Sequence, residues 1–229
     1  MSLVIDHPPT GRRERARRDK QARIKDAARM LFAQRAAGSV TTREIADRAG
    51  VAIGTLFCYV SSKAELLIMV QNEKFAAAID AGLTAAANAA GQGLLDEVLE
   101  LIRPVIVCVR EHKENGRFYL HELVFGDPNE QFRSDGLALA ARLEAGIQAT
   151  VARDGGIGHA DAFDLARVIS AIIHVNITAK VYLGLTAEEV LADIRKQIAV
   201  VLRQDRRDAF AEATRSPTSL PEGEPMTES

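Results

Sequence analysis

Apolar residues recur along most of this 229-residue chain at the spacing of an amphipathic α-helix. The first clear stripe falls at i, i+3, i+4, i+7 and i+8 and comprises Ile24, Ala27, Ala28, Leu31 and Phe32. No stretch shows the sustained alternation of β-branched and polar residues that predicts a strand, and Gly and Pro are sparse. The pattern therefore predicts an all-α protein of about nine helices.

Two short helices are predicted directly after the first. Thr41 and Glu44 have the spacing of a capping box, so a helix begins there and ends at Gly50, a residue suited to the left-handed conformation that terminates helices. After a tight turn the next helix runs from about Ile53 to Tyr59. Two short helices joined in this way predict a helix-turn-helix.

Six more helices are predicted from apolar periodicity and helix breakers. Ser62 and Glu65 form a second candidate capping box, which begins the fourth helix. Pro104 lies inside the fifth helix and is expected to kink it. The breaks that separate the helices are placed at 88–93, Asn115-Gly116, 126–128, 154–158 with Asp161 as the next cap, and 184–186.

The eighth predicted helix, 162–183, is apolar on almost every side, whereas the ninth, 187–203, is amphipathic. A membrane span is unfavourable for the eighth helix because it carries the polar residues Arg167, His174, Asn176 and Lys180. We therefore expect a second subunit to cover it, in a homodimer formed through the eighth and ninth helices. Residues 209–229 are rich in Ser, Pro, Glu and Thr and are expected to be disordered.

Charge is divided unevenly along the chain. Residues 1–63 hold 13 Lys/Arg and 6 Asp/Glu, a net +7, while the remainder carries −9. A basic first quarter indicates a nucleic-acid-binding module, although a solvated tail has the same composition. The two cysteines are too few for a disulfide framework, and the sequence shows neither a signal peptide nor an uncharged run long enough for a membrane span. We therefore expect a cytoplasmic protein without membrane partners.

The segment from Thr41 to Leu67 contains the ordered elements TTREIA, AGV, GTLF, SK and LL. These elements resemble the signature of the TetR (tetracycline-repressor-like) family, and the resemblance covers about residues 18–70. The resemblance implies a dimeric DNA-binding repressor whose effector pocket lies in its C-terminal helices. The expected divisions are a flexible basic arm (1–15), a helix-turn-helix domain (16–62), an effector-binding and dimerisation domain (63–208) and a disordered tail (209–229).

The resemblance also implies how the chain binds double-stranded DNA. The third helix would enter the major groove, with Ile53 and Thr55 facing base edges and Gly54 allowing close approach of the backbone. Ala52, Phe57 and Val60 depart from the Ser, Tyr and Phe that are common in the family, which removes a helix cap and a phosphate hydrogen bond. The predicted DNA-binding residues are Thr41, Thr42, Arg43, Ala52, Ile53, Gly54, Thr55, Phe57, Tyr59 and Lys63. A helix-turn-helix that only packs within the protein is the alternative.

A small-molecule effector of unknown identity is expected to release the repressor from a pseudo-palindromic operator, with the fourth helix acting as a lever. Polar residues on the otherwise apolar eighth helix are the candidate pocket lining, because buried polar groups need partners. The same stripe is also compatible with contacts to a neighbouring helix or to solvent. The candidate pocket residues are Phe118, His121, Phe125, Arg167, Ser170, His174 and Thr178.

The sequence offers no set of residues for catalysis. It lacks a nucleophile with its base and a phosphate loop in strand context, so neither an enzyme nor a cofactor is expected. His112, His121, Glu122 and His174 lie on separate helices without ligand-like spacing, and no metal site is predicted. Cys58 is expected to be a packed thiol. The alternative function is an all-α protein-binding adaptor without DNA affinity.

Overall fold

The computed structural model describes residues 11–127, 129–154 and 156–215, with residues 204–215 described as backbone only. Within these ranges the chain forms nine α-helices and two short 3₁₀ helices and contains no β-strand. The all-α prediction is confirmed. The elements are α1 (Arg12–Gln34), η1 (Ala37–Ser39), α2 (Thr42–Ala49), α3 (Ile53–Leu56), α4 (Lys63–Asn88), α5 (Leu94–Arg110), α6 (Lys113–Phe125), α7 (Gln131–Ala152), α8 (His159–Thr178), η2 (Lys180–Tyr182) and α9 (Ala187–Arg215).

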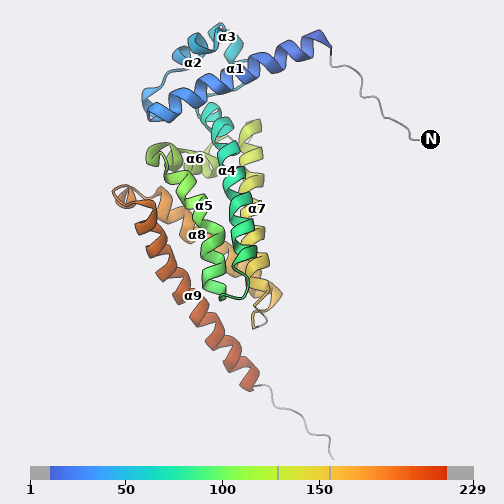
Figure 1. Ribbon diagram of the computed structural model, residues 1–229, viewed down its shortest axis with the longest axis vertical. Helices are drawn as coiled ribbons and strands as arrows, with labels where there is room; N and C mark the ends of the chain where they lie inside the picture. Colours follow the sequence, from blue (N-terminus) through green and yellow to red (C-terminus); the bar gives the residue numbers. More distant parts are fainter. Residues whose placement is uncertain (1–10, 128, 155, 216–229) are drawn as a thin grey trace, which may run out of the picture.

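Two hydrophobic clusters divide these helices into a head and a body. The head contains α1, α2, α3 and the first turns of α4, and the body contains the rest of α4 with α5 to α9 (Figure 1). Leu66 and Leu67 of α4 are fully buried in the head cluster, whereas Ile68 and Ile79 are fully buried in the body cluster. The boundary predicted between residues 62 and 63 therefore falls at the start of a helix whose first turns still belong to the head.

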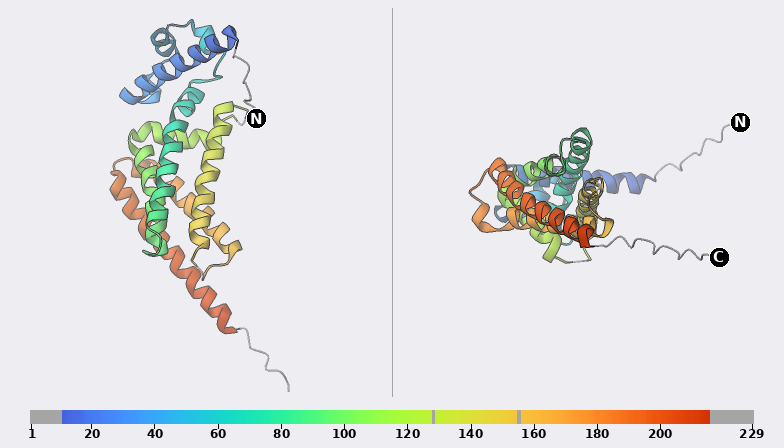
Figure 2. Two further views of the ribbon diagram at one scale, coloured as in Figure 1. Left: turned by 45° about the vertical axis from the view of Figure 1, so that its right-hand side comes forward. Right: turned by 90° about the horizontal axis from the view of Figure 1, so that it is seen from below.

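The body is a bundle in which α4 packs against α5 and α7, and α8 packs against α7 and α9. Gly82 of α4 meets α5 so closely that a Cβ at this position would overlap the carbonyl oxygen of Leu101. The last turns of α9 extend past the lower end of the other body helices (Figures 1 and 2). In the described ranges no helix combines the length and the apolar character needed to cross a membrane.

Helices extend into both segments that were predicted to be unstructured. α1 begins at Arg12, inside the segment 1–15 assigned to a flexible arm, and α9 continues to Arg215, inside the predicted disordered tail. Arginine and alanine favour helices, which accounts for helical backbone in both segments. Residues 1–10 and 216–229 of the predicted arm and tail lie outside the described residues.

The break between the fifth and sixth helices was misplaced at Asn115-Gly116. α5 ends at Arg110, and both Asn115 and Gly116 are buried inside the first turns of α6. Gly116 permits α6 to cross the end of α5, because a Cβ there would overlap the carbonyl oxygen of Val109. Asn115-Gly116 was interpreted as a turn, but here the glycine allows two helices to pack closely.

The predicted eighth helix, 162–183, was too long. α8 ends at Thr178, and the chain continues through an extended Ala179 into η2. The buried guanidinium of Arg110 donates a hydrogen bond of 2.9 Å to the carbonyl of Tyr182 and also contacts the carbonyl of Leu185, which holds this connection against α5. Asp161 does not cap α8, because Gly158 occupies the N-cap position.

Candidate nucleic-acid interface and effector cavity

The start of α2 is fixed by the predicted capping box. The Glu44 amide donates to Oγ1 of Thr41 over 3.2 Å, and the Thr41 amide donates to the Glu44 carboxylate over 2.7 Å. Arg35 at the end of α1 also donates to Glu44, over 2.8 Å. Together the Thr41 amide, the Arg35 guanidinium and the Thr41 hydroxyl lower the pKa of Glu44 to about 2. The predicted capping box is confirmed, and its carboxylate also ties α2 to α1.

The turn between α2 and α3 depends on Gly50, which adopts φ 63° and ψ 42°, the left-handed conformation that favours glycine. α3 then spans only Ile53–Leu56, and turn hydrogen bonds continue to Tyr59. The predicted helix to Tyr59 is therefore helical in its first half and a succession of turns in its second. Ala52 occupies the N-cap position of α3 without a side-chain hydrogen bond, as expected when a Ser cap is missing.

One side of α3 is buried and the other is open. Leu56 is fully buried in the head cluster, while Ile53 and Phe57 are 40% and 46% exposed. Gly54 faces open space, and Thr55 is half-buried. The residues that were predicted to meet base edges therefore lie on an uncovered surface of the head.

Most of the other predicted DNA-binding residues lie at or near the ends of the neighbouring helices. Arg43 is exposed in the first turn of α2, next to the half-buried Thr42. The hydroxyl of Thr41 donates to Glu44 over 2.9 Å, so its proton is used inside the capping box. Lys63, at the start of α4, donates from Nζ to the carbonyl of Val40 over 3.0 Å. Tyr59 is half-buried and packs against the head cluster.

The loop between α3 and α4 is held by a buried carboxylate that the sequence did not reveal. Glu130, directly before α7, accepts hydrogen bonds from the hydroxyls of Ser61 and Ser62 at 2.6 and 2.7 Å. Glu65 accepts from the backbone N–H of Ser61 at 2.6 Å, so the second predicted capping box is formed only by the bond from the Glu65 amide to Ser62. The beginning of α7 is thereby connected to the segment that follows α3.

A second buried connection joins α6 to α4. The hydroxyl of Tyr119 donates to Oδ1 of Asn72 over 2.9 Å, and the amide of Asn72 donates to the carbonyl of Phe132 at the start of α7 over 2.7 Å. Burial raises the pKa of Tyr119 far above its ordinary value, so the phenol stays protonated and remains a donor. α4, α6 and α7 therefore meet at one polar cluster around the buried Tyr119 hydroxyl.

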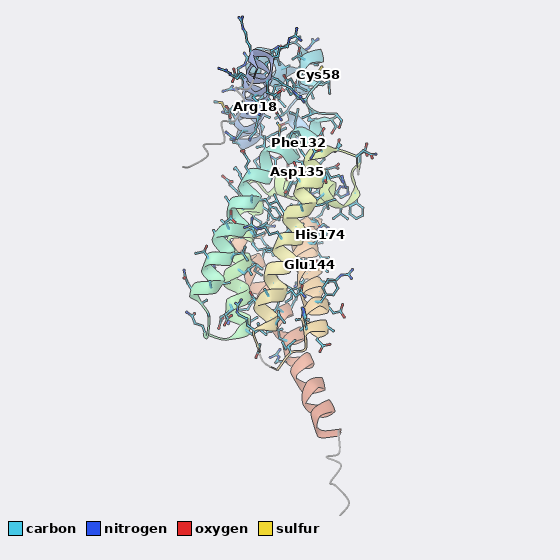
Figure 3. All side chains as sticks on the ribbon, turned by 90° about the vertical axis from the view of Figure 1, so that its right-hand side faces the viewer. Arg18, Cys58, Phe132, Asp135, Glu144 and His174 are labelled. Carbon is cyan, nitrogen blue, oxygen red and sulfur yellow. The ribbon has the colours of Figure 1, made fainter. Side chains whose placement is uncertain are left out.

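The body contains a cavity of about 500 Å³ between α4, α5, α6, α7 and α8. Its wall is mostly apolar, and its polar lining comes from Glu144 of α7 and from Arg167, Ser170 and His174 of α8. Figure 3 places Glu144 and His174 near each other in the middle of the body. The apolar lining consists of Phe75, Val105, Val109, Leu120, Val124, Ala140, Ala141, Leu143, Ala171, Ile173 and Ile177.

Three of the seven predicted pocket residues line this cavity, namely Arg167, Ser170 and His174. The other four lie outside the lining. Phe125 is 68% exposed and contacts the ring of the exposed His121, Phe118 packs against the head cluster, and Thr178 donates its hydroxyl to the carbonyl of His174. On α6 the lining face carries Leu120 and Val124, one register position away from the face that was predicted.

Burial lowers the pKa of His174, and the neighbouring His121 lowers it further. His174 is therefore mainly neutral near pH 7 and can both donate and accept a hydrogen bond at the cavity wall. In the described residues no group of three or more His, Cys, Asp or Glu side chains is arranged to bind a metal ion.

Apolar side chains remain exposed on α8 and α9. Phe163, Val168 and Val175 on α8 and Val200 on α9 are each about half exposed. Arg167 lies over the ring of Phe163, with its guanidinium carbon 5.7 Å from the ring centroid. One subunit therefore leaves part of α8 uncovered.

Comparison with known proteins agrees with this architecture. Residues 24–70, which include the helix-turn-helix, match the signature described as bacterial regulatory proteins, tetR family. The HTH-type transcriptional repressor KstR of Mycobacterium tuberculosis is 27% identical over 190 residues, which cover 82% of this chain and 81% of KstR. Its head therefore carries the helix-turn-helix of the TetR family. The resemblance seen in its sequence is thus confirmed, and the chain is a transcriptional regulator with a helix-turn-helix for DNA binding.

Two solved structures share the fold, one of them described as a TetR-family transcriptional repressor. FadR of Thermus thermophilus, solved with lauroyl-CoA, is 19% identical and has a TM-score of 0.57, with 89% of this chain and 100% of that one covered. AibR, solved with isovaleryl coenzyme A and operator DNA, is 16% identical and has a TM-score of 0.53, with 78% and 97% covered. The chain therefore shares the all-helical fold of these two proteins from the head through the body.

Proposed function

We propose that this TetR-family regulator is a homodimeric repressor that binds a pseudo-palindromic operator and is released by a small hydrophobic effector. The observation that carries the DNA-binding part is the outer side of α3, where Ile53, Gly54 and Phe57 are uncovered on a head that is otherwise packed around Leu56. Apolar and small groups on a short exposed helix fit the thymine methyls and the floor of a major groove.

The dimer is supported by the exposed apolar face of α8. Phe163, Val168 and Val175 follow one another along this helix, and Val200 is exposed on the neighbouring α9. A two-fold interface formed by the same helices of two subunits would cover these side chains and remove them from water. It would also place two heads on one side of the assembly, as successive half-sites of an operator require.

The effector site is the cavity in the body. Its volume of about 500 Å³ and its apolar wall suit an aliphatic group, and the polar side chains of Arg167, Ser170 and His174 suit the polar end of such a molecule. FadR and AibR were solved with acyl-CoA molecules. We therefore propose an acyl thioester as the effector class, with the acyl chain among the apolar residues and the carrier group at the α8 side chains.

A conformational change caused by effector binding would be transmitted to the head through the helices that line the cavity. Phe75 of α4 and Leu120 of α6 are both part of its wall. The first turns of α4 belong to the head cluster, and α6 is joined to α4 by the hydrogen bond between Tyr119 and Asn72. A ligand that favours another arrangement of α4 and α6 would change the separation of the two heads and lower operator affinity by its differential binding to the two states.

The DNA-binding proposal is tested by selecting binding sites from random duplex DNA with the full chain, followed by gel-shift titration at two salt concentrations. We expect a palindromic site and an affinity that falls steeply with salt, because phosphate contacts release counterions. Sedimentation of the free protein should give a dimer. A monomer that retards no duplex at either salt concentration would contradict the proposal and favour the protein-binding adaptor.

The effector proposal is tested separately with the selected operator. Acyl-CoA esters of increasing chain length are added to the preformed complex, and the free acids and coenzyme A alone serve as controls. Release by some chain lengths and not by coenzyme A supports an acyl thioester site. Retention of the complex with all of them would exclude this effector class while leaving the DNA-binding proposal intact.

A further inference from the structure

The first half of α1 projects beyond the packed head. The first buried residue of α1 is Ile24, and none of residues 12–23 belongs to either core. At a rise of about 1.5 Å per residue these twelve residues form an overhang of about 18 Å. Figure 1 shows this end of α1 extending past α2 and α3. We call residues 12–23 the α1 overhang.

The α1 overhang is strongly basic. It contains seven Lys/Arg and two Asp/Glu. A helix segment that contributes no residue to a hydrophobic core is marginal in water, and concentrated like charges destabilise it further. The charge therefore requires a function other than packing, and the sign of the charge points to an anionic partner.

The side of the helix that carries these charges is set by the register of α1. Arg13, Arg17 and Lys20 lie at i, i+4 and i+7, and the same line continues through the buried residues Ile24 and Leu31. That line faces the rest of the head, where α2 packs against α1. The exposed residues Arg13, Arg17 and Lys20 thus lie on the same face of α1 that packs against the rest of the head further along the helix.

The contacts of Arg23, and those of the residues on the opposite side of α1, agree with this register. The guanidinium of Arg23 lies beside Gly50 in the helix-turn-helix turn, 3.5 Å from where a Cβ would stand. Arg18 and Lys25 lie on the other side, where they line a cleft between α1, α4 and α7 together with Phe132 and Asp135 (Figure 3). The overhang therefore has one basic side toward the α3 end of the head and another toward the body.

We propose that Arg13, Arg17 and Lys20 form a second DNA contact, in which the α1 overhang lies along the phosphate backbone beside the groove entered by α3. This inference rests on the proposed DNA-binding function and extends it. Duplex DNA carries about one charge per 1.7 Å of axis, so an overhang of about 18 Å passes several phosphates. The contact contributes affinity and salt dependence and reads no bases.

The test compares two double variants of the full chain that each remove two arginines. Arg13→Ala/Arg17→Ala changes the side proposed to contact DNA, and Arg15→Ala/Arg18→Ala changes the opposite side. Both pairs lie outside the cores, and alanine preserves the helix. Affinity is measured against salt concentration for the selected operator and for a mixed-sequence duplex, and hydroxyl-radical footprints are recorded on the operator.

For Arg13→Ala/Arg17→Ala we expect the slope of log affinity against log salt to fall by about 1.8, which is about 0.9 for each lost phosphate contact, on both duplexes alike. The operator footprint should lose protection at backbone positions outside the groove that α3 enters. The Arg15→Ala/Arg18→Ala variant should retain this protection and most of the slope. Equal slopes for both variants, or an unchanged footprint, would overturn the inference. The proposed DNA-binding function would still stand in that case, provided that the wild-type protein binds the operator. Failure of the wild type to bind either duplex would overturn both.

Discussion

Asn115 in the first turn of α6 accepts a hydrogen bond from the backbone N–H of Ala37 over 2.7 Å, across the junction between body and head. Its amide nitrogen donates to the carbonyl of Phe32 over 2.8 Å and to that of Arg35 over 3.3 Å. These carbonyls belong to the last turn of α1, where helical partners are lacking. One buried side chain thus satisfies the end of α1 and joins the head to α6, which also lines the body cavity.

Replacing Asn115 with alanine should lower the free energy of unfolding by about 2–3 kcal/mol, because one buried N–H and two carbonyls lose their partner. Urea unfolding measured by circular dichroism checks this. Asn115→Asp keeps an acceptor for Ala37 but places a carboxylate against the carbonyl oxygens, so it should be destabilised at least as much. A stability equal to wild type for both variants would show that the junction does not depend on this side chain.

Thr55→Ala should change which operator bases are preferred. A hydroxyl that makes one hydrogen bond to a base edge contributes about 1 kcal/mol of discrimination at one position and little elsewhere. Competition gel shifts with operators that carry single base changes measure this effect. Thr42→Ala, on α2 outside α3, is the matched control and should reduce affinity evenly. A uniform loss for Thr55→Ala would remove it from base contact.

Lys63→Ala should weaken binding to all duplexes alike and reduce the salt slope by about 0.9, as one phosphate contact is lost. The bond from Nζ to the carbonyl of Val40 holds the ammonium near the start of α2. Lys63→Arg keeps both the charge and a donor and should retain the slope. If Lys63→Ala left both the DNA affinity and the salt slope unchanged, the role of Lys63 would be limited to its hydrogen bond with the carbonyl of Val40.

Ala140→Phe should abolish the response to effector while leaving operator binding in place, because the larger ring fills the cavity that Ala140 lines. Ala138→Phe introduces the same ring on the exposed, opposite face of α7 and serves as the control. Operator release is followed by fluorescence anisotropy during titration with acyl-CoA. Release of the Ala140→Phe complex at the wild-type concentration would place the effector elsewhere.

Acid should destabilise the head through Glu44. Its pKa is about 2 in the folded protein against an ordinary value of 4.5, so the unfolded state binds more protons over this interval. The stabilisation from Glu44 is therefore complete above about pH 4.5 and is lost as the pH falls toward 2. Thermal melting between pH 6 and 2 should show this decline, and Glu44→Gln should melt lower at pH 6 with a flatter profile. A Glu44→Gln profile parallel to wild type would contradict this assignment.

Local signals in the sequence predicted the head well. The capping residues Thr41 and Glu44, the left-handed Gly50 and the stripe from Ile24 to Phe32 act within a few residues of one another, so their spacing alone determines the structure they form. The loss of a cap at Ala52 was also visible, because a capping side chain must be local.

The body was predicted less well because its geometry depends on contacts between distant segments. Asn115 and Gly116 have the composition of a turn but are buried in a helix crossing, which no local pattern reveals. The α8 side of the cavity was identified from isolated polar residues in an apolar helix. The α6 side was missed, because Leu120 and Val124 look like ordinary core residues until the packing of α6 is known.

The contact between Gly82 and Leu101 restricts how an effector signal can travel. Since not even a methyl group fits between α4 and α5 at this point, sliding of one helix past the other is sterically blocked. In the effector response proposed above, α4 and α5 would therefore tilt together as a pair. The displacement of each α3 would then depend on the length of α4 between Gly82 and the head.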